Sequence, residues 1–443
     1  MVANLPMQRP KLATGPRAWA RKNLFRTWYD SLLTLIVAAL ALSALLSFIQ
    51  WSVTDARWSV VTENVSTLMR GIYPTDALWR VTASVLLVVG LAGVSWGVWG
   101  SRFRSIGIAL FGFAVLLLVV LSIQRGTAAA GSLSRYLTTQ FLPLLDVIRD
   151  PLLILIALLT VGALLGRGLA RANYVISSRA LVILWLVTIP LVLLLVRGLT
   201  PNTPVLPLVP TSLWGGLLLT FMMAFVASVF CFPLGILLAL GRMSGAHARR
   251  GEKGLRGWIR SQGNYPVVKI FCTIYIEFLR GVPLVTVLFT ANLLVGFALG
   301  STDIDSVVRA MVALTLFEAA YVAEIVRGGL QAVPPGQAEA ARAMGLNPLQ
   351  ATLLITLPQA LRVVIPSLVG QFITLFKDTS LVAIVGLLDL IGIAESVRQK
   401  AEFSGTQREM YVFVAAIYFV ICFSMSVAAR QLERSGSGRT TTR

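Results

Sequence analysis

The fold of this chain is decided by residues 327–390, which read RGGLQAVPPGQAEAARAMGLNPLQATLLITLPQALRVVIPSLVGQFITLFKDTSLVAIVGLLDL. Apolar runs long enough to cross a bilayer lie on either side of the polar part of this stretch, at Val307–Val326 and Val364–Leu390. The polar part is therefore a loop that two membrane-spanning helices hold at both ends.

Strong helix formers make up Gln337–Met344, and the single carboxylate, Glu339, lies near its start, where an anion suits the helix dipole. Gly345 is well placed to end this helix, and Pro348 to open the next turn. We expect a short, partly apolar helix outside the bilayer at about 337–346, an element suited to docking into a groove on a soluble partner. From the spacing alone, a helical loop without any partner is the alternative.

The same loop resembles a family signature. Glu339-Ala340-Ala341, Gly345 after a further three residues, and Ile355-Thr356-Leu357-Pro358 after another nine match the EAA signature of ABC importer permeases at every fixed position. The resemblance implies that the helix fits a cleft on a cytoplasmic ATPase and couples ATP hydrolysis to opening of the translocation path. The residues that it assigns to ATPase coupling are Glu339, Ala340, Ala341, Gly345, Ile355, Leu357 and Pro358.

The composition is that of a membrane protein. The chain is 56% hydrophobic and 13% charged, and it carries a net charge of +19. No soluble domain of this length needs so many long apolar runs. The basic residues lie in short segments between these runs, as the positive-inside rule expects, so nucleic acid is not expected as a partner.

No signature of catalytic chemistry is present. The chain lacks a G-x-x-x-x-G-K-[ST] phosphate loop, a zinc-binding motif and a nucleophile–base motif. Cys231, Cys272 and Cys422 lie in or beside apolar helices without ligand spacing, and His247 lies in a basic loop. We therefore expect no enzyme activity, no metal site and no bound cofactor here, with ATP and Mg²⁺ used by a partner ATPase.

Ten apolar segments can be placed, at 31–50, 81–99, 106–124, 151–167, 180–197, 212–240, 270–299, 307–329, 364–390 and 410–429. If the amino terminus lies inside, the basic segments, the coupling loop and the carboxyl-terminal tail all fall in the cytoplasm. We expect an all-α polytopic integral membrane protein of about ten transmembrane helices, with both termini cytoplasmic.

The proline-rich connector 201–211 divides the chain, since its prolines disfavour helix. Residues 1–200 form a membrane region of about five helices whose role the sequence leaves open. Residues 212–430 contain five spans and every recognisable motif, and 431–443 form a cytoplasmic tail. The halves show no convincing repeat, so an inverted-repeat secondary transporter gains no support.

A second motif lies at a membrane boundary before the coupling loop. Glu277 and Arg280 are three residues apart and can pair on one helical face. Gly281 and Pro283 then bend the chain into the bilayer. Interfacial anchoring followed by a turn explains the same residues. The segment Tyr275–Leu284 also resembles E-[FIL]-x-R-G-[TV]-P-L of the polar amino-acid (histidine, glutamine, arginine, opine) permeases.

Two further segments resemble the same subfamily, Ala320–Gly329 and Phe376–Leu381, the latter close to L-K-[DN]-[TS]-S-L. With its long amino-terminal half, the chain is most similar to the larger permease subunit of bacterial general L-amino-acid importers. The resemblance implies a carboxyl-terminal five-helix type I ABC importer permease core and a place in the bacterial inner membrane.

Polar residues at bilayer depth are the candidates for the substrate pathway, because burying them there is costly. They are Glu318, Tyr321, Asn292, Asp378, Thr379 and Ser380. A zwitterionic amino acid needs an anion for its ammonium group and donors for its carboxylate. An unpaired Glu318 at this depth should take up a proton, whereas a nearby cation, either the substrate's ammonium group or Lys377, would keep it ionised. Pairing between helices without substrate contact is the alternative for each residue.

The sequence thus predicts a permease subunit of an ABC importer for polar L-amino acids that works by alternating access. The expected partners are a second permease, which makes a heterodimer, two copies of a cytoplasmic ATP-binding subunit, a periplasmic solute-binding protein and the lipid bilayer. The alternatives are an ABC permease for opines or polyamines, a proton-coupled secondary transporter using Glu318 and Asp378, and an intramembrane enzyme.

Overall fold

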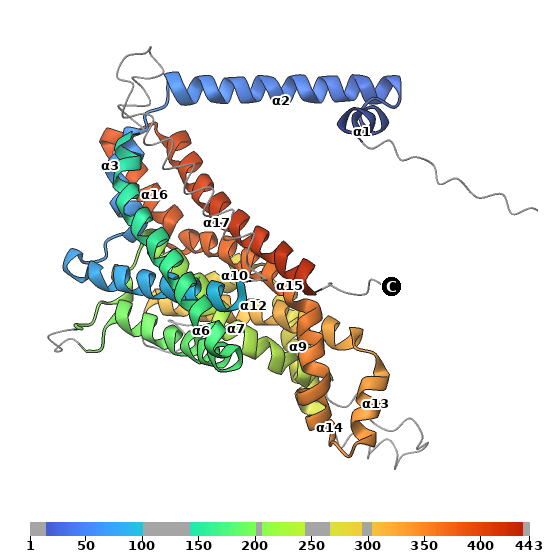
Figure 1. Ribbon diagram of the computed structural model, residues 1–443. Helices are drawn as coiled ribbons and strands as arrows, with labels where there is room; N and C mark the ends of the chain where they lie inside the picture. Colours follow the sequence, from blue (N-terminus) through green and yellow to red (C-terminus); the bar gives the residue numbers. More distant parts are fainter. Residues whose placement is uncertain (1–14, 101–141, 201–205, 244–265, 295–303, 437–443) are drawn as a thin grey trace, which may run out of the picture.

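The structure is a computed structural model that describes residues 15–100, 142–200, 206–243, 266–294 and 304–436 (Figure 1). Within these ranges every regular element is a helix, and the bridges between extended residues are isolated, from Thr200 to Pro207 and from Gly216 to Asp389. The all-α fold class expected from the sequence is confirmed.

The helices are α1 (Pro16–Asn23), α2 (Trp28–Thr54), α3 (Ser59–Arg70), α6 (Leu142–Arg197), α7 (Gly216–Met243), α9 (Pro266–Gly281), α10 (Leu284–Phe289), α12 (Ser306–Ala332), α13 (Pro335–Ala343), α14 (Pro348–Gln350), α15 (Leu357–Asp378), α16 (Leu390–Arg398) and α17 (Gln407–Gly436). A further helix covers Thr75–Gly100. Shorter 3-10 or π turns cover Thr211–Leu213, Thr290–Leu294, Ala351–Thr356, Thr379–Val385 and Ala401–Phe403.

Seven helices among the described residues are long and apolar enough to cross a membrane, or eight if the bent pair Val267–Gly281 and Leu284–Leu294 is one more span. Of the ten apolar segments expected from the sequence, all but one fall on these helices as far as the described residues extend. The remaining segment, 106–124, lies outside the described residues.

The expected spans 151–167 and 180–197 both lie in α6, on either side of a break in its helical geometry. Asn173 has φ −160° and ψ 102°, and its Oδ1 accepts a hydrogen bond from the Ile176 N–H at 3.1 Å. This is the arrangement of an N-cap, which starts a new helix. Asn173 therefore separates two helical halves that correspond to the two expected spans.

Helix α12 lies in the middle of the bundle and packs against both α7 and α15 (Figure 1). Glycines permit this close approach. A Cβ at Gly235 of α7 would lie 2.5 Å from Val322 of α12, and a Cβ at Gly329 of α12 would lie 2.5 Å from Val364 of α15. Because lipid gives helices no hydrophobic reason to associate, such close packing is what holds membrane helices together.

The amino-terminal part is packed on the part that carries the motifs. A Cβ at Gly93, in the helix Thr75–Gly100, would lie 3.2 Å from Gly162 of α6, so these two helices also approach through glycines. The Tyr73 hydroxyl donates to the Val196 carbonyl at 2.7 Å. Tyr73 and Val196 belong to the same hydrophobic cluster as the buried residues of α7 and α12.

A second hydrophobic cluster joins α3, α16 and α17 at the end of the bundle opposite α13 (Figure 1). Asp389 caps α16 by accepting a hydrogen bond from the Gly392 N–H at 2.9 Å. The Leu390 N–H donates to the Thr220 hydroxyl of α7 at 3.1 Å. These contacts fix α16 to the start of α7, whereas α2 buries none of its residues.

Helix α13 ends in a turn that favours glycine. Gly345 has φ +85°. Its N–H donates to the Arg342 carbonyl at 3.0 Å, and the Leu346 N–H donates to the Ala341 carbonyl at 3.2 Å. These two bonds make a Schellman motif, in which a residue without a Cβ is preferred. The sequence-based interpretation of Gly345 as a helix terminator is confirmed.

We predict that Gly345→Val abolishes transport at normal expression, whereas Gly345→Asn retains most of it. No atom lies within 4 Å of a Cβ placed at this position, so only the backbone resists substitution. A left-handed conformation costs an ordinary residue about 1–2 kcal/mol, and Asn adopts it more readily than a β-branched residue. Substrate uptake, normalised to the amount of protein in the membrane, measures the effect. Equal uptake by wild type and Gly345→Val would show that the turn is not required.

Candidate functional site

The coupling loop, residues 333–356, continues directly from α12. Two extended residues, Val333 and Pro334, separate α12 from α13. Pro335 takes up the first turn of α13, where its missing N–H is not needed. The expected helix is therefore present, but it covers Pro335–Ala343 rather than about 337–346. Glu339 lies in its second turn, so the expectation that this carboxylate lies near the helix start is wrong. Because so short a connection leaves little slack, a displacement of α13 is passed on to α12.

Small buried residues hold α13 against the returning segment 351–356. The exposed fraction is 6% for Ala341 and 3% for Ala351, so larger side chains would not fit without displacing the helix. Farther along, the Gln359 Nε2 donates to the Gln337 Oε1 at 3.3 Å. The loop is thus folded back on itself.

The turn after α13 is also built from local signals. The Asn347 Oδ1 accepts a hydrogen bond from the Gln350 N–H at 2.8 Å, and the Gln350 Oε1 accepts one from the Asn347 N–H at 3.0 Å. This reciprocal pair is a capping box, and Pro348 lies in the first turn that it caps. The expectation that Pro348 opens a new turn is confirmed.

Some residues of the signature are packed inside the loop, and others are exposed on its surface. Ala341 is buried and Ile355 and Leu357 are half-buried, whereas Glu339, Ala340, Gly345 and Pro358 are exposed. Large apolar side chains are exposed beside them: Met344 at 83%, Leu349 at 64% and Leu354 at 63%. Large apolar side chains exposed within one short loop are typical of a protein interaction site.

A cluster of charged residues joins α7, α9 and α12 where α12 approaches the coupling loop. The Glu324 carboxylate binds the guanidinium groups of Arg327, of Arg242 at 3.3 Å and of Arg280 at 4.0 Å. Arg242 also binds Glu277 at 2.6 Å. Three cations and two anions from three helices thus form one network.

This network corrects the expected pair between Glu277 and Arg280. Although three residues apart on α9, they have different partners, Arg242 for Glu277 and Glu324 for Arg280. Helix α7 and helix α12 supply charges that the spacing within one helix does not reveal. Glu324 does point away from Glu318, as its position six residues along the same helix predicts.

The bend after Arg280 is as expected. Helix α9 ends at Gly281, α10 begins after Pro283, and the two axes differ by 107°. Pro283 has φ −61° and ψ 137°, an extended conformation that starts the next helix. Gly281 and Pro283 therefore redirect the chain at this point.

Glu318 is completely buried in α12 between α7 and α15. Its Oε2 accepts a hydrogen bond from the Gln371 Nε2 at 2.8 Å. Its Oε1 has no hydrogen-bond partner among the described residues. The Asp378 carboxyl group is an electrostatic neighbour of Glu318. Two carboxyl groups with one amide donor form a site that favours a cation or a proton.

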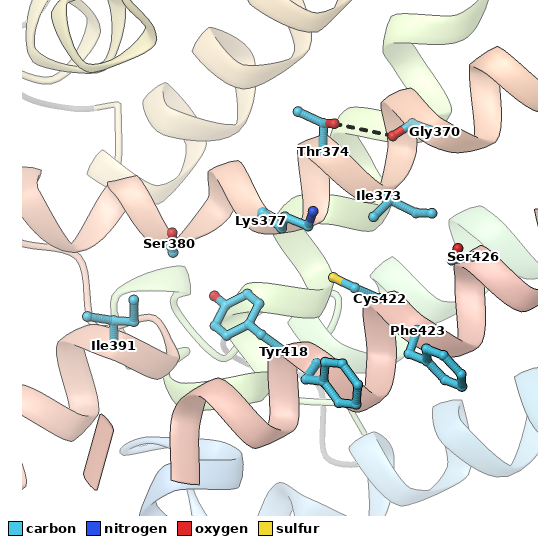
Figure 2. A pocket seen from close by; sticks show the side chains of 11 residues that line it. Gly370, Ile373, Thr374, Lys377, Ser380, Ile391, Tyr418, Cys422, Phe423 and Ser426 are labelled. Carbon is cyan, nitrogen blue, oxygen red and sulfur yellow. Dashed lines mark hydrogen bonds between the residues drawn. The ribbon is translucent and has the colours of Figure 1, made fainter. Parts of the chain in front are cut away.

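Gln371 was not among the residues proposed from the sequence. Its signal was nevertheless present, because Gln371 and Asp378 are seven residues apart and lie on one face of α15. Lys377, one of the two cations expected beside Glu318, has turned to another face of α15 (Figure 2). Of the two cations considered for Glu318, Lys377 is therefore not its partner among the described residues, and Gln371 instead donates the hydrogen bond to it.

The other pathway candidates lie in different surroundings. The Tyr321 ring lies 5.2 Å from the Phe317 ring and 5.7 Å from the Arg280 guanidinium. Asn292 is buried, and its Nδ2 donates to the Leu288 carbonyl at 3.2 Å. Thr379 is buried and donates within its own turn. The structure thus brings Glu318 and Asp378 together without gathering every candidate at one point.

Ser380 lines a separate pocket between α15 and α17 (Figure 2). The pocket has a volume of about 560 Å³. Lys377 points into it from α15, and Tyr418 and Cys422 face it from α17. Its lining contains no carboxylate, so the one charged side chain on its wall is a cation.

Comparisons with known proteins agree with these features. The family model described as "Binding-protein-dependent transport system inner membrane component" matches residues 260–436. The inner membrane amino-acid ABC transporter permease protein YhdY of Escherichia coli (strain K12) is 33% identical over 454 residues, covering 98% of this chain and 97% of that protein.

A second relative is the glutamate/glutamine/aspartate/asparagine transport system permease protein BztC of Rhodobacter capsulatus, which is 36% identical over 390 residues, covering 86% of this chain and 79% of that protein. A solved structure titled "Crystal structure of an amino acid ABC transporter with histidines" is 30% identical, with a TM-score of 0.41, and covers 50% of this chain and 92% of that chain.

A bundle of membrane-spanning helices with an ordered coupling loop defines the membrane subunit of a transporter. The similarity over nearly the whole length of both chains then shows the family. This chain belongs to the amino-acid ABC transporter permeases, multi-pass proteins of the inner membrane.

We predict that Glu318→Gln and Glu318→Ala affect stability differently. The first keeps an acceptor for Gln371, whereas the second leaves the Gln371 amide unsatisfied, which costs about 1–3 kcal/mol. The midpoint of thermal unfolding in detergent should fall for Glu318→Ala and remain near wild type for Glu318→Gln. If Glu318 recognises an ammonium group, Glu318→Gln also abolishes uptake or changes its selectivity. Unchanged transport kinetics would remove Glu318 from the substrate site.

The charge network gives a further prediction. Glu324→Gln leaves three guanidinium groups with Glu277 as their remaining carboxylate, and the lost charged hydrogen bonds are worth about 1.5–3 kcal/mol. Glu277→Gln is the matched control, because the Glu277 side chain is 56% exposed and that of Glu324 22% exposed. The midpoint of thermal unfolding should fall further for Glu324→Gln than for Glu277→Gln. The reverse order would show that the network does not centre on Glu324.

Proposed function

We propose that this permease forms one half of a heterodimeric pathway that imports polar L-amino acids by alternating access. Two copies of an ATP-binding subunit lie on the cytoplasmic side, one of them docked on this coupling loop, and a solute-binding protein docks at the opposite end. The observation that carries the proposal is the coupling loop itself, which is folded, joined to α12 by two residues, and exposes apolar side chains beside Glu339.

The packing of α12 explains how such a loop acts on the pathway. Helix α12 holds Glu318 in the middle of the bundle and Glu324 in the charge network, and it runs into α13 after two residues. A push from the ATPase on α13 therefore moves a helix whose buried face contacts both α7 and α15. In this proposal, Ala341, Ile355 and Leu357 keep the loop folded, while Glu339, Ala340 and Pro358 face the ATPase.

The substrate and partners are proposed from chemistry and from the names of relatives. The names of BztC and BztB describe two permeases of one transport system, which supports a heterodimer. The sequence lacks a phosphate loop, so ATP hydrolysis belongs to a partner subunit. The buried Glu318 and its half-buried neighbour Asp378 support a substrate that carries an ammonium group.

We further propose that residues 212–430 are the permease unit and that residues 1–200 support it as additional membrane helices. The shared hydrophobic cluster supports this arrangement, since Tyr73 and Val196 pack with residues of α7 and α12. Tail residues 431–443 and both termini lie in the cytoplasm in this proposal, as the basic segments require.

The proposal is tested by reconstituting the full complex in liposomes with ATP enclosed on the side of the ATPase. Uptake of labelled polar amino acids should require ATP hydrolysis and the binding protein, and should persist when a protonophore removes the proton gradient. Uptake that needs the gradient and not ATP would overturn the proposal in favour of a proton-coupled transporter.

We predict that Glu339→Lys leaves the protein in the membrane and uncouples it from its ATPase. The change reverses the charge of an exposed side chain on the docking face. Because Glu339 lies in the second turn of α13, the effect comes from the lost contact with the ATPase and not from the helix dipole. Co-purification of the ATPase and ATP-driven uptake should both fall at least about tenfold, the effect of about 1.4 kcal/mol.

Glu402→Lys is the matched control for this prediction, because Glu402 is an exposed glutamate in the turn Ala401–Phe403, at the end of the bundle opposite α13 (Figure 1). This variant should bind the ATPase as the wild type does. Survival of both uptake and co-purification in Glu339→Lys would contradict the docking assignment.

A further inference from the structure

We propose that the pocket between α15 and α17 is a subsite for the carboxylate group of the transported amino acid, with Lys377 as its cation. The inference rests on the proposed function, because it names the part of the pathway that receives the substrate's negative end. The residues that carry it are Lys377 on α15, Ser380 in the turn Thr379–Val385 that follows α15, and Cys422 on α17 (Figure 2).

The first argument is the position of Lys377 in the bilayer. Lys377 lies within Pro348–Val385, a stretch apolar enough to cross a membrane. Its side chain is nevertheless exposed on the surface of the bundle. A lysine at membrane depth is costly unless it faces water, an anion or protein. The surface around Lys377 is therefore not ordinary lipid-facing surface.

The second argument is the lack of a partner for the ammonium group. Within the described part of the chain, Lys377 makes no ion pair of the kind seen for Arg242, Arg280 and Arg327, and donates no hydrogen bond. Its neighbour Asp378 is half-buried near Glu318 and interacts with the Lys377 charge without forming an ion pair with it. The cation thus remains available to a ligand in the pocket.

The third argument is the chemistry of the wall. No carboxylate lines the pocket, and hydroxyl groups of Thr374, Ser380 and Ser426 accompany the lysine. The Thr374 hydroxyl is already used, since it donates to the Gly370 carbonyl at 3.3 Å (Figure 2). A cation with nearby hydroxyl donors suits a carboxylate, which accepts hydrogen bonds through both oxygens. A volume of about 560 Å³ is ample for an amino acid with water around it.

The subsite is distinct from the buried pair of carboxyl groups. Gln371, which binds Glu318, and Lys377 are separated by roughly 9 Å along α15 at 1.5 Å per residue, and they lie on different faces. Neither Glu318 nor Asp378 lines the pocket. Helix α15 therefore presents negative charge to the core of this subunit and positive charge to the pocket.

Cys422 provides a direct probe of the pocket. It lines the pocket and is partly exposed, whereas Cys231 and Cys272 are buried. In the full complex, the anionic sulfonatoethyl methanethiosulfonate should modify Cys422 faster than the cationic trimethylammonioethyl reagent, and substrate should slow both reactions. Cys422→Ser is the control that removes this signal.

The charge preference should be lost in Lys377→Met and kept in Lys377→Arg. The ratio of the two reagent rates is the readout, because any change in thiol ionisation alters both rates alike. A pocket that faces lipid would leave Cys422 unmodified by either water-soluble reagent. That result, or equal rates in the wild type, would overturn the proposal without any variant having to fold.

Transport by the variants tests the ligand. The concentration of amino acid for half-maximal uptake should rise about tenfold to a hundredfold in Lys377→Met, less in Lys377→Arg, and not at all in Lys269→Met, an exposed lysine of α9 outside the pocket. The wild type should also discriminate between the amino acid and its carboxamide as competitors, and Lys377→Met should lose that discrimination. Retained discrimination in Lys377→Met would overturn the assignment.

The lipid composition of the liposomes distinguishes two possible anions at Lys377, the carboxylate of the substrate and the phosphate of a lipid. If Lys377 binds a lipid phosphate, anionic phosphatidylglycerol in the liposomes should protect Cys422 and the substrate should not, which would overturn the proposal. Protection by substrate in purely zwitterionic phosphatidylcholine supports it. If the wild type shows no ATP-dependent uptake, the proposed function fails. If the wild type transports and Lys377→Met is unchanged, the subsite alone fails.

Discussion

The close packing of α12 is the constraint on which the rest of the structure depends. Val322 of α12 packs against Gly235 of α7, and Val364 of α15 packs against Gly329 of α12. At both contacts the side chain of one helix lies against the backbone of the other. Packing of this kind is rigid, because interiors at high density pass strain on rather than absorb it. Since α12 is held so tightly and is joined to α13 by two residues, we propose that it transmits movement between the loop and the core.

Charge placement follows from the same helix. Near the loop, the Glu324 carboxylate forms ion pairs with arginines of α7, α9 and its own helix. Its charge is therefore balanced by side chains of this chain. Six residues earlier on α12, Glu318 has a single amide donor and a carboxyl neighbour. The negative charge of Glu324 is thus balanced by cations, whereas Glu318 has no cation beside it among the described residues. An uncompensated polar group in the middle of a membrane protein is expensive, and such a group is retained where function requires it.

Local features were predictable from the sequence, whereas partners across helices were not. Gly345, Pro348 and the bend at Gly281–Pro283 depend on backbone preferences of a few adjacent residues, and the structure has them where the sequence indicated. The spacing on one helix predicts a pair of Glu277 and Arg280. In the structure Glu277 instead binds Arg242 of α7. Which helices are neighbours is decided by tertiary packing, which a helical period does not encode.

Helix α15 shows why that difference matters for function. Its polar residues could be read from the sequence as one interruption of an apolar run. The structure places Gln371 and Asp378 of α15 toward Glu318, and Lys377 of α15 toward the pocket beside α17, which Ser380 of the following turn also lines. Opposite charges on adjacent residues would neutralise each other if they paired. Directed to separate faces of one helix, they instead create two sites of opposite sign, as the two ends of a zwitterion require.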